Sequence, residues 1–399
     1  MSAGLLVVNA GSSSVKLAGY EIADGVARLP KPLMTVQVEA GPSGLSVDAS
    51  ADGRTVFSVR IGGRNDGVDL VVEGIHALLG LAEERRPRLR WDAAGHRIVH
   101  GGARHRAPAL LDAQVINDLA QLSPLAPLHQ PANLHGVEVV AARCRDVRQV
   151  GCFDTAFHAD LPPLETWFAL PRAWHGAGVR RYGFHGLAYE SVLLQLTEIR
   201  DDERVLLAHL GSGASLCALH GGRSVATSMG FTALDGLMMG TRCGSIDPGA
   251  VLHLLRQPGM TIDAVERLLA RDSGLRGVSG ISADMRELLA SSEPAAAEAI
   301  ELFCHRAVRE AGGLIALMGG IDRLVFSGGV GEHAAPVRAR ICEQLGWLGL
   351  RLASESNLVH ARVISAPSSR VAVNVVAADE QGLIAAHTAL LTGLLPAEG

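Results

Sequence analysis

The sequence predicts an α/β protein made of two similar lobes, each built on a mixed β-sheet flanked by helices. Three observations support this prediction. A chain of 399 residues is long enough for two domains with separate cores. Apolar stretches of strand length alternate with stretches of helical spacing along most of the chain. A strand–turn–strand pattern near the N-terminus recurs in the second half, which is typical of an internal duplication.

The first copy of this pattern spans residues 5–17, where an apolar strand enters a turn with three serines and leaves as a second strand. Such a turn offers backbone N–H groups, hydroxyls, an amide and the Lys16 ammonium to one anion, so it suits a polyphosphate. A Walker A loop is excluded, because neither Lys16 nor Lys31, the two lysines of the chain, follows a glycine. Taken alone, the pattern would equally fit an ordinary serine-rich hairpin.

The second copy spans residues 206–216, and its Gly211-Ser212 pair aligns with Gly11-Ser12. Each copy continues through a polar turn into a further strand. Because the whole strand–turn–strand frame is repeated, the sequence favours two lobes that each supply a phosphate-binding turn over a chance match.

The remaining elements follow from hydrophobic spacing and from Gly and Pro breaks. Strands are expected in residues 33–61 (several short ones), 97–99, 150–154 and 322–326. Helices are expected in residues 68–79, 110–122, from Pro131, 249–256, 294–318 and from Pro336. We expect the chain to cross between lobes near Phe153-Asp154 and near Glu380, which divides it into an N-terminal lobe (1–153 plus 381–399) and a C-terminal lobe (154–380).

Composition excludes several classes of function. The net charge of −5 argues against a nucleic-acid or anionic-membrane partner. No apolar run approaches the about 18 residues that a membrane helix needs. The six cysteines are scattered without a Cys-x-x-Cys pair, which favours free thiols in a reducing, cytoplasmic location.

A third glycine-rich junction, residues 327–332, follows the strand at 322–326 and precedes a helix. Glycines there allow close backbone approach to a ligand. Together with the two serine or glycine turns, this junction resembles the superfamily of actin, sugar kinases and heat-shock ATPases. The resemblance implies a duplicated actin-like ATPase (ribonuclease H-like) fold with the active site in the cleft between the lobes.

Within that superfamily, ordered motifs resemble those of the acetate kinase family from about Leu5 to His387. The motifs lie in residues 9–16, 95–102, 126–129, 153–158, 181–186, 228–232, 240–242, 246–248 and 328–332. This resemblance implies a homodimer that uses ATP and Mg²⁺ (or Mn²⁺) to phosphorylate a short-chain carboxylate, acetate or propionate, reversibly and by direct in-line transfer. Two alternatives stay open: a kinase for a larger or branched acid such as butyrate, and a non-catalytic ATP-binding relative.

The residue types suit this chemistry, because joining a carboxylate to a phosphoryl group requires several anions to be held together. Arginine forks can bind both anions, and an ionised carboxylate needs no general base, unlike the hydroxyl substrate of a sugar kinase. The resemblance assigns catalytic roles to Arg97, His129, Asp154, His185 and Arg242. It assigns ATP and phosphate contacts to Asn9, Ser12, Ser14, Lys16, His209, Gly211, Ser212, Gly213, Asp284, Met285, Arg286, Gly329, Val330, Gly331 and Glu332. It assigns the acyl pocket to Val99, Leu128, Phe184 and Ala233, and the metal to Asn9 and Glu380, with Asp379 as the adjacent alternative.

Several positions depart from the family pattern, among them Leu187 and Ala188, which replace two hydroxyl residues. Ala233 stands where acetate kinases usually carry proline, which predicts more room for the alkyl tail and a shift toward propionate. Tyr189, Ser212 and Ser245 replace a histidine, an asparagine and an aspartate of the pattern. We expect an active enzyme, because the pattern's key residues are present: Arg97, Asp154, His185, Arg242 and Glu380.

Overall fold

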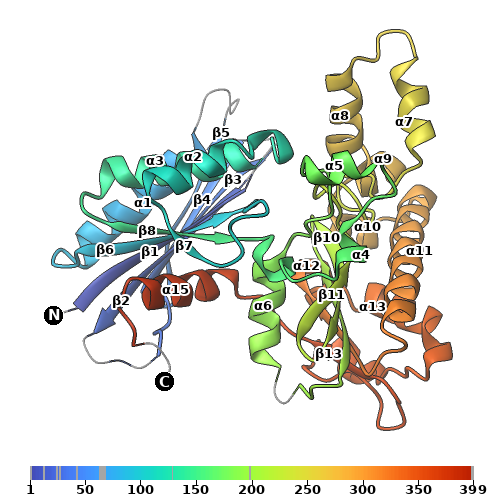
Figure 1. Cartoon of the computed structure of the whole chain (residues 1–399). Helices are drawn as coiled ribbons and strands as arrows, with labels where there is room; N and C mark the ends of the chain where they lie inside the picture. The colour runs from blue at the N-terminus through green and yellow to red at the C-terminus, as the bar shows by residue number, and fades with distance from the viewer. Residues whose placement is uncertain are drawn as a thin grey trace. The chain divides into compact units, whose positions relative to one another are not determined.

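The computed structural model describes residues 2–11, 14–23, 26, 28–41, 44–62, 69–127, 129–196 and 199–396. The chain forms two compact units, unit 1 (Met1–Phe157 with Asp379–Gly399) and unit 2 (His158–Ala378) (Figure 1). The predicted boundaries differ slightly from this division, since Asp154 and Glu380 were assigned to the C-terminal lobe and belong to unit 1. Asp154 stays with unit 1 because its backbone N–H donates to the Ile98 carbonyl at 3.1 Å.

Unit 1 is built on an eight-stranded sheet of order β5-β4-β3-β2-β1-β6-β8-β7. Its strands are β1 (Ser2–Ala10), β2 (Ser14–Ala23), β3 (Met34–Gly41), β4 (Gly44–Ala51), β5 (Arg54–Gly62), β6 (Trp91–Ile98), β7 (Ala109–Leu110) and β8 (Arg148–Phe153). Its helices are α1 (Leu70–Arg85), α2 (Ala113–Ala120), η1 (Ser123–Leu125), α3 (Gln130–Arg143) and α15 (Glu380–Leu391). Strands β1 to β5 run antiparallel in sequence, whereas β1, β6 and β8 are parallel neighbours.

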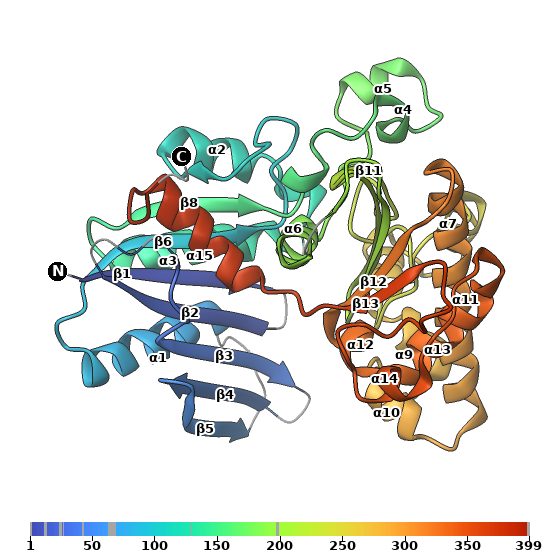
Figure 2. The same cartoon turned by 90° about the horizontal axis from the view of Figure 1, so that it is seen from below.

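The two faces of this sheet are covered by different helices (Figure 2). Successive residues of β1 and of β6 point to opposite faces, so they contact different helices. Leu6 and Val8 of β1 join the core under α1 and α3. On β6, Gly95 points to α15, where a Cβ would lie 2.2 Å from the hydroxyl oxygen of Thr388. The absence of a side chain at Gly95 therefore lets α15 lie directly on the sheet. Arg97, two residues further along the strand, points to the same face as Gly95.

Unit 2 is built on a five-stranded sheet of order β11-β10-β9-β12-β13. Its strands are β9 (Arg204–Leu210), β10 (Ala214–His220), β11 (Arg223–Thr227), β12 (Arg323–Ser327) and β13 (Ala372–Val375). Strands β9 to β11 are antiparallel and β9, β12 and β13 are parallel neighbours. The order β3-β2-β1-β6-β8 of unit 1 has the same plan, which confirms the predicted duplication.

The helices of unit 2 include short ones in the connections and one long one against the sheet. They are α4 (Pro163–Thr166), α5 (Arg172–Gly176), α6 (Gly186–Gln195), α7 (Pro248–Leu255), α8 (Ile262–Arg271), α9 (Gly274–Ser279), α10 (Met285–Ala290), α11 (Pro294–Leu317), α12 (Gly328–His333), α13 (Ala335–Gln344), η3 (Gly346–Leu348) and α14 (Ser354–Leu358). Helix α11 packs on β9, β10 and β11 through its buried stripe, which includes Ile300, Phe303 and Ala307.

Two predicted elements differ from the structure. Leu110, expected to begin a helix, instead forms β7 with Ala109, because this strand pairs with Gly151 and Val150 of β8. Helix α2 begins only after the Asp112 cap. Of residues 327–332, expected as a turn, all but the first lie in the short helix α12. The first N–H group of this helix, that of Gly328, donates to the Glu332 carboxylate at 2.9 Å. The strands in 33–61 and the helix in 294–318 are confirmed.

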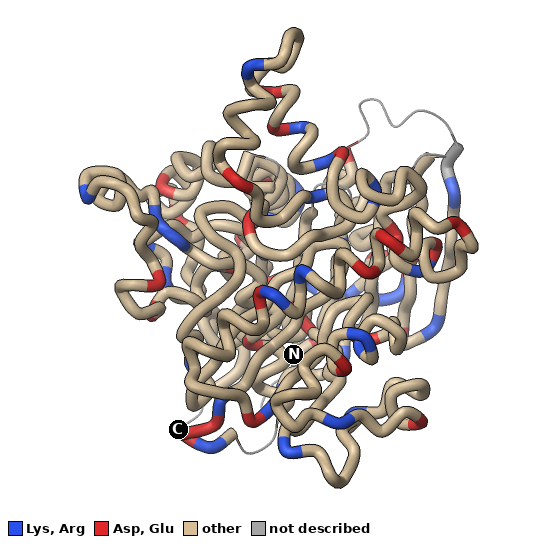
Figure 3. Tube along the Cα trace, turned by 90° about the vertical axis from the view of Figure 1, so that its right-hand side faces the viewer, with Lys and Arg blue, Asp and Glu red and all other residues tan. Residues whose placement is uncertain are grey.

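Charged residues of both signs are interspersed along the trace (Figure 3). Among the described residues, every helix is too short or too polar to cross a lipid bilayer.

Candidate functional site

In unit 1, four predicted site residues lie together where three parallel strands end. Asn9 is near the end of β1, Arg97 is near the end of β6, and Asp154 directly follows β8. Glu380 is the first residue of α15, the helix that Gly95 allows onto this face. The carboxyl edge of parallel strands is the usual place for ligand-binding residues in α/β folds.

The Arg97 guanidinium connects this cluster. Its Nη2 donates to Asp154 Oδ2 at 2.6 Å, and its Nε lies 3.1 Å from both oxygens of that carboxylate. On the other side, Nη1 donates to Asn9 Oδ1 at 3.3 Å and lies 3.9 Å from Glu380 Oε2. Asn9 Nδ2 in turn donates to Glu380 Oε2 at 3.0 Å. Asp154 thus holds the guanidinium through Nε and Nη2, and Nη1 faces the Asn9 amide and the Glu380 carboxylate.

Burial explains why this geometry is rigid. The Asp154 side chain is 1% exposed, compared with 22% for Arg97 and 18% for Glu380. Burial raises the pKa of Asp154, and the Arg97 charge opposes that rise. Burial alone would lower the pKa of Arg97, but the Asp154 and Glu380 carboxylates outweigh it and hold the pKa above its ordinary value. Arg97 is therefore a permanent cation with a buried carboxylate behind it and a partly exposed edge in front.

The other predicted residues of unit 1 lie around this cluster to different degrees. Lys16 is directly opposite Asn9 in the β1–β2 register, so the two side chains share one face of the sheet. Ser14 closes the first turn, because its carbonyl accepts from Gly11 N–H at 2.8 Å. Val99 is buried, and its N–H donates to Asn133 Oδ1. His129 lies at the start of α3. Ser12 and Leu128 lie outside the described residues.

In unit 2, the second turn meets His185 and Arg242. His185 precedes α6 in a left-handed conformation (φ 60°), and its Nδ1 lies 2.8 Å from Ser215 Oγ. A Cβ on Gly213 would lie 3.2 Å from His185 Nε2 and 3.8 Å from Arg242 Nη1. The glycine thus leaves room for an imidazole and a guanidinium beside the same stretch of backbone.

Arg242 is held by the segment that contains the Ala233 departure. Its Nη1 donates to the Ala233 carbonyl at 3.0 Å and lies 3.7 Å from Met239 Sδ. The predicted acyl-pocket position and the predicted catalytic arginine are therefore in direct contact. Phe184, the residue before His185, is buried, and its carbonyl lies 3.0 Å from His158 Nε2.

The predicted nucleotide loops of unit 2 also come together. A Cβ on Gly211 would lie 3.9 Å from Gly329 N. Gly240 N–H donates to the Ser212 carbonyl at 3.0 Å, and a Cβ on Gly240 would lie 3.2 Å from the Ala283 carbonyl. The second turn, the Gly-Gly junction and the segment before α10 therefore surround one region.

The side chains of that region differ in which of their groups remain able to contact a ligand. The Asp284 carboxylate caps α10 and binds Arg286 at 2.5 Å, and this bond lowers the pKa of Asp284. Arg286 itself is 89% exposed. Met285 is buried in the core, so a ligand would meet its backbone. Glu332 Oε1 accepts from the N–H groups of Gly328 and Ala378, which occupies part of that carboxylate. Val330 and Gly331 lie in α12.

Two serines with a place in this site were not predicted. Ser215 contacts His185, and Ser327 Oγ lies 3.1 Å from His209 Nδ1. Ser215 pairs with His209 in the β9–β10 register, as Lys16 pairs with Asn9 in unit 1. Aligning the second strand of each repeat, in which Lys16 and Ser215 occupy equivalent positions, would have identified Ser215 from the sequence.

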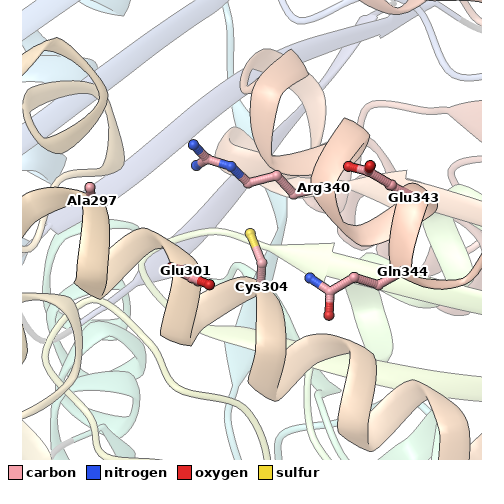
Figure 4. Close-up of a pocket in the computed structure, with 6 residues that line it drawn as sticks. All are labelled: Ala297, Glu301, Cys304, Arg340, Glu343 and Gln344. Atoms are coloured by element: carbon pink, nitrogen blue, oxygen red, sulfur yellow. The ribbon is translucent and has the colours of Figure 1, made fainter.

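A separate pocket of about 310 Å³ lies between α11 and α13 (Figure 4). It is lined by Ala297, Glu301, Cys304, Arg340, Glu343 and Gln344. None of these belongs to the predicted site, so the pocket is distinct from the region around the second turn.

Comparison with known proteins agrees with the arrangement of these motifs. The model of the acetokinase family matches residues 4–386. An acetate kinase of Rhodopseudomonas palustris (strain TIE-1) is 48% identical over 400 residues, which cover 97% of this chain and 98% of the relative. A propionate kinase from Francisella tularensis subsp. tularensis SCHU S4 superposes with a TM-score of 0.85 at 33% identity, covering 97% of this chain and 99% of the other. The acetate kinase of Porphyromonas gingivalis gives a TM-score of 0.81 at 34% identity, covering 97% and 98%. The chain described here belongs to the acetokinase family.

Proposed function

We propose that this protein transfers the γ-phosphoryl group of ATP to a short-chain carboxylate, acetate or propionate, and forms the acyl phosphate reversibly. The observation that supports this most directly is the Arg97 guanidinium, which a buried carboxylate holds on one side and which is partly exposed beside Asn9 and Glu380. A fixed guanidinium of this kind suits a planar carboxylate or a phosphoryl group. The related acetate and propionate kinases support the same reaction class.

The reaction needs charge neutralisation more than proton transfer. A carboxylate substrate is already ionised at neutral pH and attacks the phosphorus directly, so no general base is required. We assign Arg97 to the carboxylate and the transferring phosphoryl group, with Asp154 holding the guanidinium. Arg242 and His185 would stabilise the phosphoryl oxygens as their charge rises.

ATP would be bound by the loops of unit 2. Backbone N–H groups of residues 211–213 and 329–331 would donate to the phosphates, and the segment at 284–286 would lie against the nucleoside. The glycines at these positions leave the backbone accessible, since a Cβ on Gly329 would meet nothing within 4 Å. His209, Ser14 and Lys16 would add contacts to the phosphates.

Mg²⁺ fits the residues of the unit 1 cluster. Glu380 Oε2 accepts from Asn9 Nδ2 at 3.0 Å, so the two side chains are neighbours. The Glu380 carboxylate and the Asn9 Oδ1 atom are the kinds of oxygen ligand that this ion prefers. Within the described parts of the chain, no group of three or more His, Cys, Asp or Glu side chains forms a metal cage. The ion would therefore rest on these two residues and on the phosphates, whose charge it would neutralise when bound.

We also propose that the protein is a cytoplasmic homodimer. The six free cysteines support the reducing location. The dimer rests on the family resemblance alone, and light scattering with the purified chain tests it.

The experiment that tests the reaction is trapping of the acyl phosphate with hydroxylamine across acetate, propionate, butyrate and branched acids. We expect product with acetate and propionate, and a higher kcat/KM for propionate because Ala233 leaves more space beside Arg242. A clear acetate optimum would contradict the Ala233 argument. ATP binding without turnover on any acid would favour the non-catalytic alternative, and phosphorylation of a sugar would contradict the proposal.

A further inference from the structure

Three side chains behind the second turn form one hydrogen-bonded chain. His185 Nδ1 lies 2.8 Å from Ser215 Oγ, and the same oxygen makes a short hydrogen bond with the Tyr189 hydroxyl. Tyr189 lies in the first turn of α6, and its backbone N–H donates to the His185 carbonyl at 3.0 Å, which keeps the two residues close together. Ser215 and Tyr189 are both fully buried, so bulk water is kept from the bridge.

The direction of the two hydrogen bonds follows from acidity. A phenol is a stronger acid than an aliphatic hydroxyl, and an imidazole nitrogen is a stronger base than a phenol oxygen. Both hydroxyls are buried, so burial penalises both anions and leaves this order unchanged. The favoured arrangement therefore has Tyr189 O–H donating to Ser215 Oγ and Ser215 O–H donating to His185 Nδ1.

This direction decides where the imidazole carries its proton. If Nδ1 accepts a hydrogen bond, the proton of the neutral ring is on Nε2. Nε2 is the atom that lies 3.2 Å from the Cβ position of Gly213, beside Arg242 Nη1. The ring thus presents an N–H donor to the turn where we place the phosphates.

We propose that Tyr189 and Ser215 are positioning residues that hold His185 in its Nε2–H form, ready to donate to the phosphoryl group. The role of His185 in this inference rests on the proposed function. Tyr189 is also one of the departures from the family pattern, and the relay gives the phenol a use at a position where that pattern has histidine.

The variants that test this relay are Tyr189→Phe, Ser215→Ala and the double substitution, with Ser215→Thr as the variant that keeps the hydroxyl. We expect each of the first two to lower kcat about 10-fold, because His185 then populates both neutral forms, with KM for ATP nearly unchanged. The double variant should show no larger loss of kcat than either single variant, because the two residues act in series. Ser215→Thr should keep most of the activity.

A spectroscopic measurement separates positioning from packing. In ¹⁵N-histidine-labelled protein, with the His185 signal assigned by a His185→Gln variant, wild type should show an unprotonated Nδ1 and a protonated Nε2. Tyr189→Phe should shift both signals toward a mixture while the melting curve stays cooperative. Additive losses with an unchanged ¹⁵N spectrum would overturn the relay, as would full activity in both single variants. If wild type itself makes no acyl phosphate, the proposed function fails, and the ¹⁵N spectrum still decides the relay.

Discussion

At the residue scale, the central feature is an arginine whose orientation is set by a buried carboxylate. Arg97 makes three contacts with Asp154, a side chain that solvent hardly reaches. A charge-assisted, forked pair of this kind is stronger and more directional than a surface ion pair. In the reaction that we propose, this pair has the value that the guanidinium does not have to reorganise when the substrate arrives.

Replacing Asp154 with Asn should therefore impair the reaction more than the fold. The amide cannot accept both arms of the fork, so we expect kcat to fall about 100-fold because Arg97 loses its orientation. The matched control is Asp92→Asn, which disrupts the Arg90–Asp92 pair of the same unit, where Arg90 is 85% exposed. The control should keep wild-type kcat. Equal losses in both variants would contradict an orienting role for Asp154.

Gly213 provides a second test at this scale. A methyl group in Gly213→Ala would sit 3.2 Å from His185 Nε2, in the space that we assign to a phosphoryl oxygen. We expect kcat to fall at least about 10-fold through displacement of His185, with a smaller effect on unfolding. Gly313→Ala, whose Cβ would meet nothing within 4 Å in α11, is the control and should leave activity unchanged. Wild-type kinetics in Gly213→Ala would rule out a ligand at this position.

At the element scale, one glycine of β6 determines where a helix lies. Because Gly95 has no side chain, α15 can approach the sheet and bring Glu380 at its first residue beside Arg97. The strand alternation then places Asn9 and Arg97 on this same face. The position of the Glu380 carboxylate thus depends on the packing contact between β6 and α15.

Substituting this glycine should affect stability and activity together. In Gly95→Ala the new methyl would overlap Thr388 Oγ1 at 2.2 Å and Ile384 Cγ2 at 2.7 Å, so α15 must shift. We expect a loss of about 1–3 kcal/mol in the free energy of unfolding, measured in urea, with a rise in the Mg²⁺ concentration needed for activity. Gly80→Ala in α1 has open space around its Cβ and should be neutral or stabilising. Unchanged stability in Gly95→Ala would mean that α15 does not pack as described.

At the scale of the whole molecule, a duplicated sheet gives each unit its own set of groups that we propose to bind anions. Asn9 with Lys16 in unit 1 and His209 with Ser215 in unit 2 occupy equivalent register positions. The copies have diverged in chemistry, since one pair carries an ammonium and the other an imidazole. We interpret this divergence as a division of labour between metal and carboxylate chemistry in unit 1 and nucleotide binding in unit 2.

The metal requirement tests this division. Chelation with EDTA should abolish phosphoryl transfer, and added Mg²⁺ or Mn²⁺ should restore it. Glu380→Gln should raise the Mg²⁺ concentration for half-maximal activity about 10-fold or more, because an amide is a weaker ligand than a carboxylate. Glu298→Gln, an exposed change on α11, is the control. An unaltered Mg²⁺ dependence in Glu380→Gln would remove this residue from the metal site.

Local patterns in the sequence were sufficient to predict most helices and strands and the internal repeat. Hydrophobic spacing predicted the strands between residues 33 and 61 and the long helix α11, because an apolar face must be buried by any fold that the chain adopts. The two errors, at Leu110 and at residues 328–332, concern short segments. The two-residue strand β7 exists only through its partner β8, and the first N–H group of the short helix α12 is satisfied by the Glu332 side chain.

The sequence by itself determined the α/β class, the duplicated strand plan and the residue types able to bind phosphates and a carboxylate. Those properties depend on periodicity and on the chemistry of individual side chains, which are local. Only the tertiary structure decided that Asn9, Arg97, Asp154 and Glu380 share one hydrogen-bonded cluster, and that Ser215 joins Tyr189 to His185. Such contacts depend on which strands become neighbours and how closely a helix packs on them. A hydrogen bond forms only within about 3 Å, and local sequence patterns do not position side chains of distant segments that accurately.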